Sequence, residues 1–227
     1  MTPTSGQPAD TRSVAAAAVA VGRAVPSIDD LVARAERMIG AGRRVLGIAG
    51  APGSGKSTLA EALVDRLGER ARLLPMDGFH LANEELVRRG FTDRKGAADT
   101  FDIDGYVTTL QRVRQRHVDV LAPRFDRALE AAIAGSIRID TSADLVITEG
   151  NYLLLGDGPW AQVAPLLDEC WMIEIDDAIR RQRLVQRHQQ FGRSPDAARA
   201  WVEQVDEANT ALIRATSSRP DLVVHLS

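Results

Sequence analysis

The stretch Gly50–Ser57 reads GAPGSGKS, which is the complete GxxxxGKS/T pattern of a phosphate-binding loop. The apolar run 45–49 before it predicts a buried parallel strand, and residues 58–64 after it predict the start of a helix. The loop amides and the helix N-terminus would then face an anion. Glycines let the backbone wrap a polyphosphate without Cβ clashes. We therefore expect a nucleotide to bind at nine consecutive residues: Gly50, Ala51, Pro52, Gly53, Ser54, Gly55, Lys56, Ser57 and Thr58.

Two side chains of this loop carry the expected chemistry. Lys56 would place a compact charge on the β- and γ-phosphates, and the Ser57 hydroxyl would bind Mg²⁺. The chain has 26 arginines but only two lysines, Lys56 and Lys95. A GC-rich coding bias explains why lysine is rare. It does not explain why one lysine lies in the loop, where a planar guanidinium would replace an ammonium poorly.

Length and composition limit the class of protein. The chain has 227 residues, 44% apolar and 26% charged, as in a soluble globular protein of one domain. The net charge of −3 gives no reason to expect nucleic acid or a membrane as a partner. No run approaches the roughly 18 apolar residues of a membrane span. The single cysteine, Cys170, excludes an intrachain disulfide. We expect a cytoplasmic protein, because nucleotide is abundant there.

Apolar strands alternate with helices along the chain. This order predicts a doubly wound α/β fold, in which a mostly parallel sheet is flanked by helices on both faces. We expect residues 1–24 to be a flexible extension and residues 25–227 to be a single domain. The expected strands are 45–49, 72–76, 144–148, 169–175 and 222–225, and the expected helices are 28–39, 58–67, 83–89, 106–113, 178–190 and 196–215.

Three of these strands end in residues that can bind a ligand or take part in catalysis. The first runs into the phosphate-binding loop, the second ends at Asp77 and the third ends at Glu149. Ligands of a parallel sheet bind outside the carboxyl ends of its strands. We therefore expect the loop and both acids to share one site.

The loop alone fits kinases, GTPase switches, motors and transporter subunits, and the rest of the chain narrows this choice. We find no guanine-reading NKxD-type segment and no signature sequence of a transporter ATPase. The chain is also too short for most motor cores.

Several segments after the loop resemble one family. They are 76–80 (MDGFH), 89–91 (RGF), 94–102 (RKGAADTFD), 123–127 (PRFDR) and 147–154 (ITEGNYLL). In this order they resemble the uridine kinase, phosphoribulokinase and bacterial pantothenate kinase group of P-loop kinases, in particular its nucleoside/nucleotide kinase-like branch with the fructose transport-system kinase-like proteins. The resemblance covers roughly residues 28–227. It implies a P-loop NTPase fold with a small lid at about 180–195, and ATP and Mg²⁺ as cofactors.

The resemblance also implies catalytic roles. Asp77 would take or orient the proton of the acceptor hydroxyl, although an Asp before a glycine can also simply form a turn. Glu149 would hold Mg²⁺, directly or through water, or orient Asp77, unless it merely ends a strand. Arg183 and Arg187 lie four apart on one helix face. With Lys56 they would neutralise the transferring phosphoryl group, or else they form a solvated face.

The acceptor side is less sharply defined by the sequence. Arg94 and Lys95 could hold an anion or lie in solvent, and Asp102 could bind acceptor hydroxyls or cap the helix that follows. His80 could bind the acceptor or be structural, and Phe125 and Asp126 resemble an aromatic–acid pair that frames a polyol. The candidate acceptor residues are Asp77, His80, Arg94, Lys95, Asp102, Phe125, Asp126 and Asn209.

Two departures from the family pattern bear on the acceptor. Phe125 and Arg127 stand where pantothenate kinases carry a Tyr-x-His pair, and Gly78-Phe79-His80 differs from the Ser-Phe-Tyr type of uridine kinases. The acceptor therefore stays open between a sugar, a nucleoside and a pantothenate-like alcohol.

We expect an ATP-dependent phosphotransferase that moves the γ-phosphoryl group to a hydroxyl of a small metabolite. The alternative is a nucleotide-binding regulatory protein of a transport or metabolic operon, without turnover. The expected partner is the small-molecule acceptor, with neither nucleic acid nor membrane, and a homodimer stays open.

Overall fold

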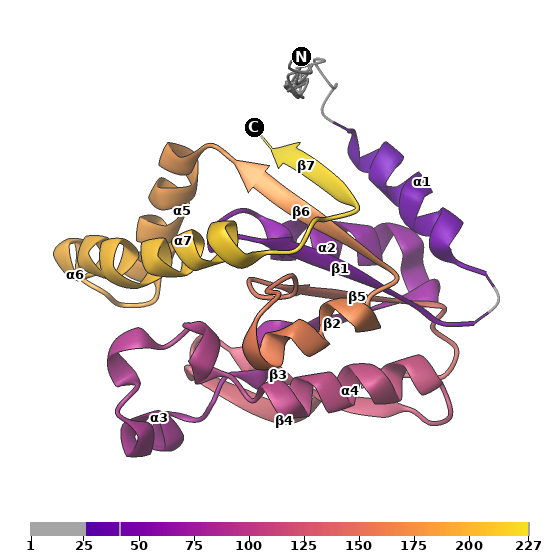
Figure 1. Ribbon diagram of the computed structural model, residues 1–227, viewed down its shortest axis with the longest axis horizontal. Coiled ribbons are helices and arrows are strands. Elements are labelled where there is room, and N and C mark those ends of the chain that lie inside the picture. The colour runs from indigo at the N-terminus through magenta and orange to yellow at the C-terminus, as the bar shows by residue number, and fades with distance from the viewer. Residues whose placement is uncertain (1–25, 41, 227) are drawn as a thin grey trace, which may run out of the picture.

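The fold is a parallel sheet between two layers of helices (Figure 1). The structure, a computed structural model, describes residues 26–40 and 42–226, so the expected extension at residues 1–24 lies outside the described residues. The sheet has the strand order β2-β5-β1-β6-β7, which confirms the predicted doubly wound α/β class. Its strands are β1 (Arg44–Gly50), β2 (Ala71–Pro75), β5 (Leu145–Gly150), β6 (Glu169–Ile175) and β7 (Leu222–Leu226).

The helices lie between or after these strands, as the alternating pattern predicts. None of the helices in the described part of the chain is long and apolar enough to cross a membrane. Their bounds are α1 (Ile28–Met38), α2 (Lys56–Leu67), α3 (Asn83–Arg89), α4 (Ile103–Gln115), α5 (Asp177–Gln190), α6 (Pro195–Trp201) and α7 (Glu207–Thr216).

Helices α1 and α2 cover one face of the sheet. Helix α1 begins with a capping box: the Ser27 hydroxyl oxygen accepts from the Asp30 amide, and the Asp30 carboxylate accepts from the Ser27 amide. Leu31 of α1 and Leu63 of α2 are buried in one cluster with Ile48 of β1. This packing fixes α2, and with it the loop that precedes α2, against the central strand.

Helices α4 and α7 contribute to the cover on the other face. Because side chains alternate along a strand, Val45 and Ala49 of β1 point to this side and join a cluster with Tyr106 of α4. The Tyr106 hydroxyl lies 2.6 Å from the hydroxyl of Thr148, which itself donates to the Leu74 carbonyl at 2.6 Å. This buried polar chain is fully paired, so it fixes α4 on β5 and β2 without a desolvation penalty.

The C-terminal helix, which we expected to be continuous over 196–215, is interrupted. A π-helical turn at Val202–Asp206 separates α6 from α7. Trp201 and Asp206 are five residues apart, which in an α-helix would place them about 140° apart. The wider π turn brings both side chains to one cavity.

The structure contains a two-stranded antiparallel hairpin that we did not predict from the sequence. It consists of β3 (Val120–Asp126) and β4 (Ala131–Ile139), and it lies beside α4 in Figure 1. The pairing register shifts between Ala122 and Arg124, around Pro123, and most of β4 is exposed. This irregular segment lacks the clean alternation of apolar and polar residues by which a strand is recognised.

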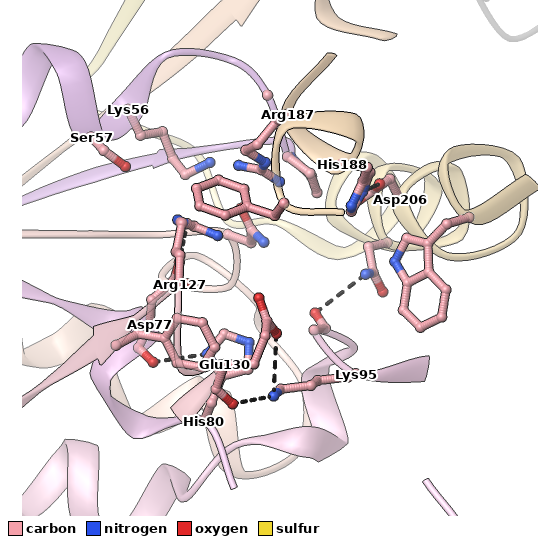
Figure 2. Close-up of a pocket in the computed structure, with 18 of the residues that line it drawn as sticks. Lys56, Ser57, Asp77, His80, Lys95, Arg127, Glu130, Arg187, His188 and Asp206 are labelled. Atoms are coloured by element: carbon pink, nitrogen blue, oxygen red, sulfur yellow. Dashed lines mark hydrogen bonds and ion pairs between the residues drawn. The ribbon is translucent and has the colours of Figure 1, made fainter. Parts of the chain in front are cut away.

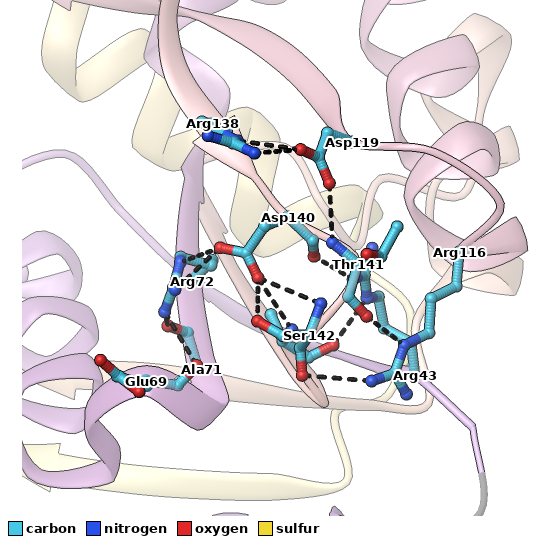
Figure 3. A network of polar contacts seen from close by, with 11 residues as sticks. Arg43, Glu69, Ala71, Arg72, Arg116, Asp119, Arg138, Asp140, Thr141 and Ser142 are labelled. Carbon is cyan, nitrogen blue, oxygen red and sulfur yellow. Dashed lines mark hydrogen bonds and ion pairs between the residues drawn. The ribbon is translucent and has the colours of Figure 1, made fainter.

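A buried arginine fastens the base of this hairpin (Figure 3). Arg43, just before β1, donates through Nε to the Ala143 carbonyl at 2.9 Å and through Nη1 to the Val113 carbonyl at 3.2 Å. Its Nη2 donates to the Asp140 carbonyl. The Asp140 carboxylate in turn pairs with Arg72 of β2 at 2.8 Å. The hairpin is thereby joined to both the sheet and α4.

The other end of β3 packs against a 3-10 turn, η2 (Met76–Phe79), directly after β2. A Cβ atom at Gly78 would overlap the carbonyl oxygen of Pro123. Glycine is therefore required for the hairpin to approach the turn that carries Asp77.

We predict that Gly78→Ala will lower the free energy of unfolding by about 1–3 kcal/mol, because β3 must move away from η2. Chemical denaturation monitored by circular dichroism measures the change. Gly40→Ala is the matched control, since a Cβ atom there meets nothing within 4 Å. Equal stability of the two variants would contradict the close packing.

Candidate functional site

The phosphate-binding loop joins β1 to α2, and its backbone is shaped for an anion. Gly53 and Gly55 have φ values of 79° and 98°, a left-handed conformation that favours glycine. Helix α2 begins at Lys56, so its unpaired amides face the hollow of the loop. The buried Ser54 hydroxyl lies in the same loop and has no hydrogen-bond partner within the described part of the chain. The loop thus has the polar groups of an oxyanion cradle.

Lys56 is buried, and its Nζ donates to the Ala51 carbonyl at 3.0 Å. Burial lowers the pKa of this amine to about 8, although the charges of Glu149 and Asp77 oppose the change. A buried ammonium with one neutral partner is poorly solvated. It is therefore poised to bind a phosphate oxygen.

Glu149 ends β5, and β5 is the direct neighbour of β1 in the sheet. One oxygen of its carboxylate accepts from the Ser57 hydroxyl at 3.0 Å. Burial, together with the negative charge of Asp77, raises the pKa of Glu149 to about 7. A cation between Glu149 and Ser57 would relieve this unfavourable burial of charge.

Asp77 lies in η2, at the carboxyl end of β2 (Figure 2). Its Oδ2 pairs with Nη2 of Arg127, from the turn of the hairpin, at 2.9 Å. Burial alone would raise the pKa of Asp77, but His80 and the cations Arg127 and Lys56 outweigh it and hold the pKa below its usual range. Since burial also lowers the pKa of His80, that ring is neutral at pH 7, and at this pH the charges of Arg127 and Lys56 keep Asp77 ionised.

These groups face one polar cavity of about 270 Å³ (Figure 2). Its far wall is aromatic: the His80 ring lies 4.1 Å from that of Phe101 and 4.6 Å from that of Phe125, measured between centroids. Of the predicted site residues, the structure brings eleven to this cavity: Pro52, Gly53, Lys56, Ser57, Asp77, His80, Lys95, Phe125, Glu149, Arg187 and Asn209.

The two predicted lid arginines of α5 are placed differently. Arg187 lines the polar cavity and also a second hollow beside the loop, whereas Arg183 lines only that second hollow. Burial lowers the pKa of Arg187, which has no acidic group as a hydrogen-bond partner among the described residues. Arg180 is instead structural, because it is buried and paired with Asp177 and Glu207.

The second hollow is lined largely by apolar side chains. It extends from the loop over α2 and α1 to the end of β7, and Thr58 lies on its wall. Its apolar lining residues are Pro26, Ile28, Leu31, Leu59, Ala62, Leu184 and Leu226. It meets the polar cavity at Lys56, Ser57 and Arg187, so the two hollows form one continuous site around the loop.

Three of the candidate acceptor residues lie outside the polar cavity. Arg94 pairs with Asp99 at 2.9 Å, and its guanidinium stacks on the Phe91 ring. Asp102 caps α4 by accepting from the Gly105 amide at 3.0 Å, which is the alternative we considered for it. Asp126 accepts from two amides in the hairpin turn. We therefore do not retain these three as acceptor contacts.

The remaining acceptor candidates are held by neighbouring groups. Lys95 donates to the Asn83 side chain at 2.8 Å and to the Glu130 carbonyl at 2.7 Å. Asn209 of α7 donates to the Gly96 carbonyl at 3.2 Å. The loop that contains Lys95 and Gly96 is therefore fixed between the hairpin tip and α7.

Sequence reasoning assigned no role to several cavity residues. Arg127 comes from the unpredicted hairpin; its place in the family-like segment 123–127 was a signal for the acceptor side, but its contact with Asp77 depends on how the hairpin packs. His188 of α5 pairs with Asp206 of the π turn at 2.9 Å, and Trp201 stacks with Arg193 at 3.8 Å. His188 follows Arg187 directly, a spacing that does not place two side chains on one helix face, and its contact with Asp206 depends on how α5 packs against the following helix.

Comparison with known proteins agrees with this geometry. A Schizosaccharomyces pombe protein named "putative uridine kinase" is 33% identical over 215 residues, covering 88% of this chain and 91% of that protein. The crystal structure of a "putative fructose transport system kinase" from Silicibacter sp. TM1040 matches with a TM-score of 0.79 and 36% identity, covering 87% of this chain and 98% of that one.

A pantothenate kinase of Enterococcus faecalis is 28% identical over 68% of this chain, and the match spans 51% of that protein. No protein-family model matches the chain. The nearly full-length matches to the fission yeast protein and to the Silicibacter structure, together with the loop geometry, establish the family. The chain belongs to the P-loop kinase group of uridine kinases, pantothenate kinases and phosphoribulokinases, and it is an ATP-dependent kinase of small molecules.

Proposed function

We propose that this kinase transfers the γ-phosphoryl group of Mg-ATP to a hydroxyl of a small polar metabolite, namely a sugar, a nucleoside or a pantothenate-like alcohol. The observation that carries the proposal is that Asp77 and Lys56 face the same polar cavity from neighbouring segments. We also propose that the protein works in the cytoplasm, where ATP is abundant.

The two hollows suggest how the substrates lie. The apolar hollow beside Leu59 and Leu226 suits the adenosine part of ATP, because apolar side chains favour a flat heterocycle over water. The phosphates would then run along the loop amides to Lys56, and the acceptor would occupy the polar cavity. The γ-phosphate would lie where the two hollows meet.

The residues at this junction fit Mg²⁺ only together with phosphates. No group of three or more His, Cys, Asp or Glu among the described residues could hold a metal alone. Mg²⁺ commonly takes one or two protein ligands plus phosphate oxygens and water, and Ser57 with Glu149 supplies such a pair. When bound there, the ion would neutralise charge on the phosphates.

Asp77 then acts on the acceptor. Its ionised carboxylate accepts the hydroxyl proton while the acceptor oxygen attacks phosphorus in line with the leaving ADP. Lys56 and Arg187 stabilise the negative charge of the transferring group, and the buried position of Lys56 strengthens that interaction.

A panel of acceptors tests the proposal directly. We expect one sugar, nucleoside or pantothenate-like alcohol to stimulate ADP release from Mg-ATP, and we expect Lys56→Ala to abolish the stimulation. A flat response across the panel, with ATP binding demonstrated by calorimetry, would favour a regulatory nucleotide-binding protein instead.

We expect Asp77→Asn to lower kcat for transfer by about 10²–10⁴-fold, the usual contribution of a general base, while the Kd of Mg-ATP changes little. Steady-state kinetics and calorimetry measure the two quantities. Asp104→Asn, an exposed residue in the first turn of α4, serves as the control. Parallel loss of ATP binding and turnover would refute the role of Asp77 as the base.

The pKa values predict a narrow pH profile of kcat/KM for Mg-ATP, with an optimum between pH 7 and 8. Glu149 is protonated below its pKa of about 7 and then binds Mg²⁺ poorly, so the rate falls as the pH drops. Lys56 loses its charge above its pKa of about 8, so the rate also falls as the pH rises. In Glu149→Gln the fall in rate at low pH, which is the acidic limb of the profile, should disappear. In Glu36→Gln, on the surface of α1, it should remain. An unchanged acidic limb in Glu149→Gln would contradict the assignment.

A further inference from the structure

Arg127 stands at the centre of the site, yet nothing in the loop motif requires it. It lies in the turn between β3 and β4 and lines both the polar cavity and the apolar hollow. Its charge lowers the pKa of Glu149 and opposes the protonation of Lys56 and Arg187. The guanidinium is therefore within electrostatic reach of each group that would contact the γ-phosphate.

The Arg127 guanidinium is hydrogen-bonded to Oδ2 of Asp77, the oxygen that would accept the proton of the acceptor. Among the described residues, Asp77 Oδ2 has one side-chain partner, Nη2 of Arg127 at 2.9 Å (Figure 2). A carboxylate oxygen that accepts from a guanidinium has a lower affinity for a proton. Asp77 is thus a weak base while Arg127 is bound to it. Without acceptor, the molecule that Asp77 would otherwise activate is water.

The ion pair is also easy to exchange. Arg127 is 39% exposed and Asp77 26%, and pairs of this kind are held weakly because water screens them. Arg127 contacts no other carboxylate in the described structure within ion-pair distance. Once the acceptor hydroxyl has taken its place on Asp77, the transferring phosphoryl group at the junction of the two hollows would offer the guanidinium a new anionic partner.

We propose that Arg127 is a further catalytic residue that couples ATP use to the presence of the acceptor. Without acceptor it stays on Asp77 and suppresses hydrolysis of ATP. The acceptor hydroxyl takes its place on Asp77 Oδ2, and the guanidinium turns to the transferring phosphoryl group. This inference rests on the proposed function of the same site.

In the transfer step one proton and one phosphoryl group change partners. The O–H bond of the acceptor breaks and its proton moves to Asp77 Oδ2, while the acceptor oxygen forms a bond to the γ-phosphorus. The bond between the γ-phosphorus and the bridging oxygen breaks, and its electron pair leaves with ADP. Arg127 donates to the equatorial oxygens of the transferring group and takes no part in the exchange of bonds or protons.

The position of Arg127 depends on the hairpin rather than on the nucleotide loop. The tip is held at a second point, where Lys95 pairs with Glu130 at 3.4 Å and donates to its carbonyl. Lys95 and Glu130, which belongs to the hairpin tip, both line the acceptor end of the cavity. An acceptor that fills this end therefore contacts the segment that presents Arg127, so its arrival can release the guanidinium from Asp77.

Hydrolysis of ATP without acceptor tests this inference. We expect Arg127→Met to raise acceptor-free ADP release by about tenfold, because Asp77 is then free to orient water, while the Kd of Mg-ATP changes by less than about threefold. Added guanidine should restore the suppression. Arg138→Met is the control, since it removes an arginine from the same hairpin at a surface pair with Asp119. A structural defect would lower hydrolysis rather than raise it.

A second variant keeps the outcome unambiguous. In the double variant Arg127→Met with Asp77→Asn, the additional hydrolysis should disappear, because its base is gone. Unchanged or reduced hydrolysis in Arg127→Met would overturn the role of Arg127, and so would additional hydrolysis that persists in the double variant. The proposed function fails separately, if the wild-type protein phosphorylates no acceptor in the panel.

Discussion

The burial of charged groups at one edge of the sheet is the constraint on which the rest of the structure depends. Lys56, Asp77 and Glu149 lie at the ends of adjacent segments, β1, β2 and β5, whose parallel order brings them together. Burying charge is unfavourable unless partners compensate for it. Asp77 meets this condition through its ion pair with Arg127. Among the described residues, the buried Lys56 and Glu149 have only neutral hydrogen-bond partners, and the pKa values of both are shifted toward the uncharged form. Nucleotide and cation would complete the pairing.

The hairpin connects this charged edge with the end of the polar cavity where we propose that the acceptor binds. Its base is fixed by the buried Arg43, its middle by the close approach of Pro123 to Gly78, and its tip by ion pairs on Asp77 and Lys95. The attachment is firm at the base and exchangeable at the tip. Such a gradient suits a segment that must keep its place in the fold while its end responds to a small molecule.

The nucleotide side of the site could be predicted from sequence because it is built locally. A strand, a glycine-rich turn and a helix start follow one another within residues 45–67, and the parallel order of strands places Asp77 and Glu149 beside them. The acceptor side depends on contacts between distant segments. Arg127 reaches Asp77 only because an irregular hairpin packs on η2, and this contact leaves no periodic pattern in the sequence. Asp102 is a local case: its capping of α4 was one of the two alternatives that the sequence offered, and the structure decides between them.

The π turn at Val202–Asp206 has a consequence for how such a protein diversifies. A π turn holds one residue more than an α-helical turn, so straightening it to α-helix without removing a residue would rotate every later side chain by about 100° relative to α6. Asp206 and Asn209 would then turn away from the polar cavity and their neighbours would take their places, while the loop after β1 would be untouched. A substitution that favours the α form here could thus give related kinases a differently lined pocket in a single evolutionary step, with the loop intact.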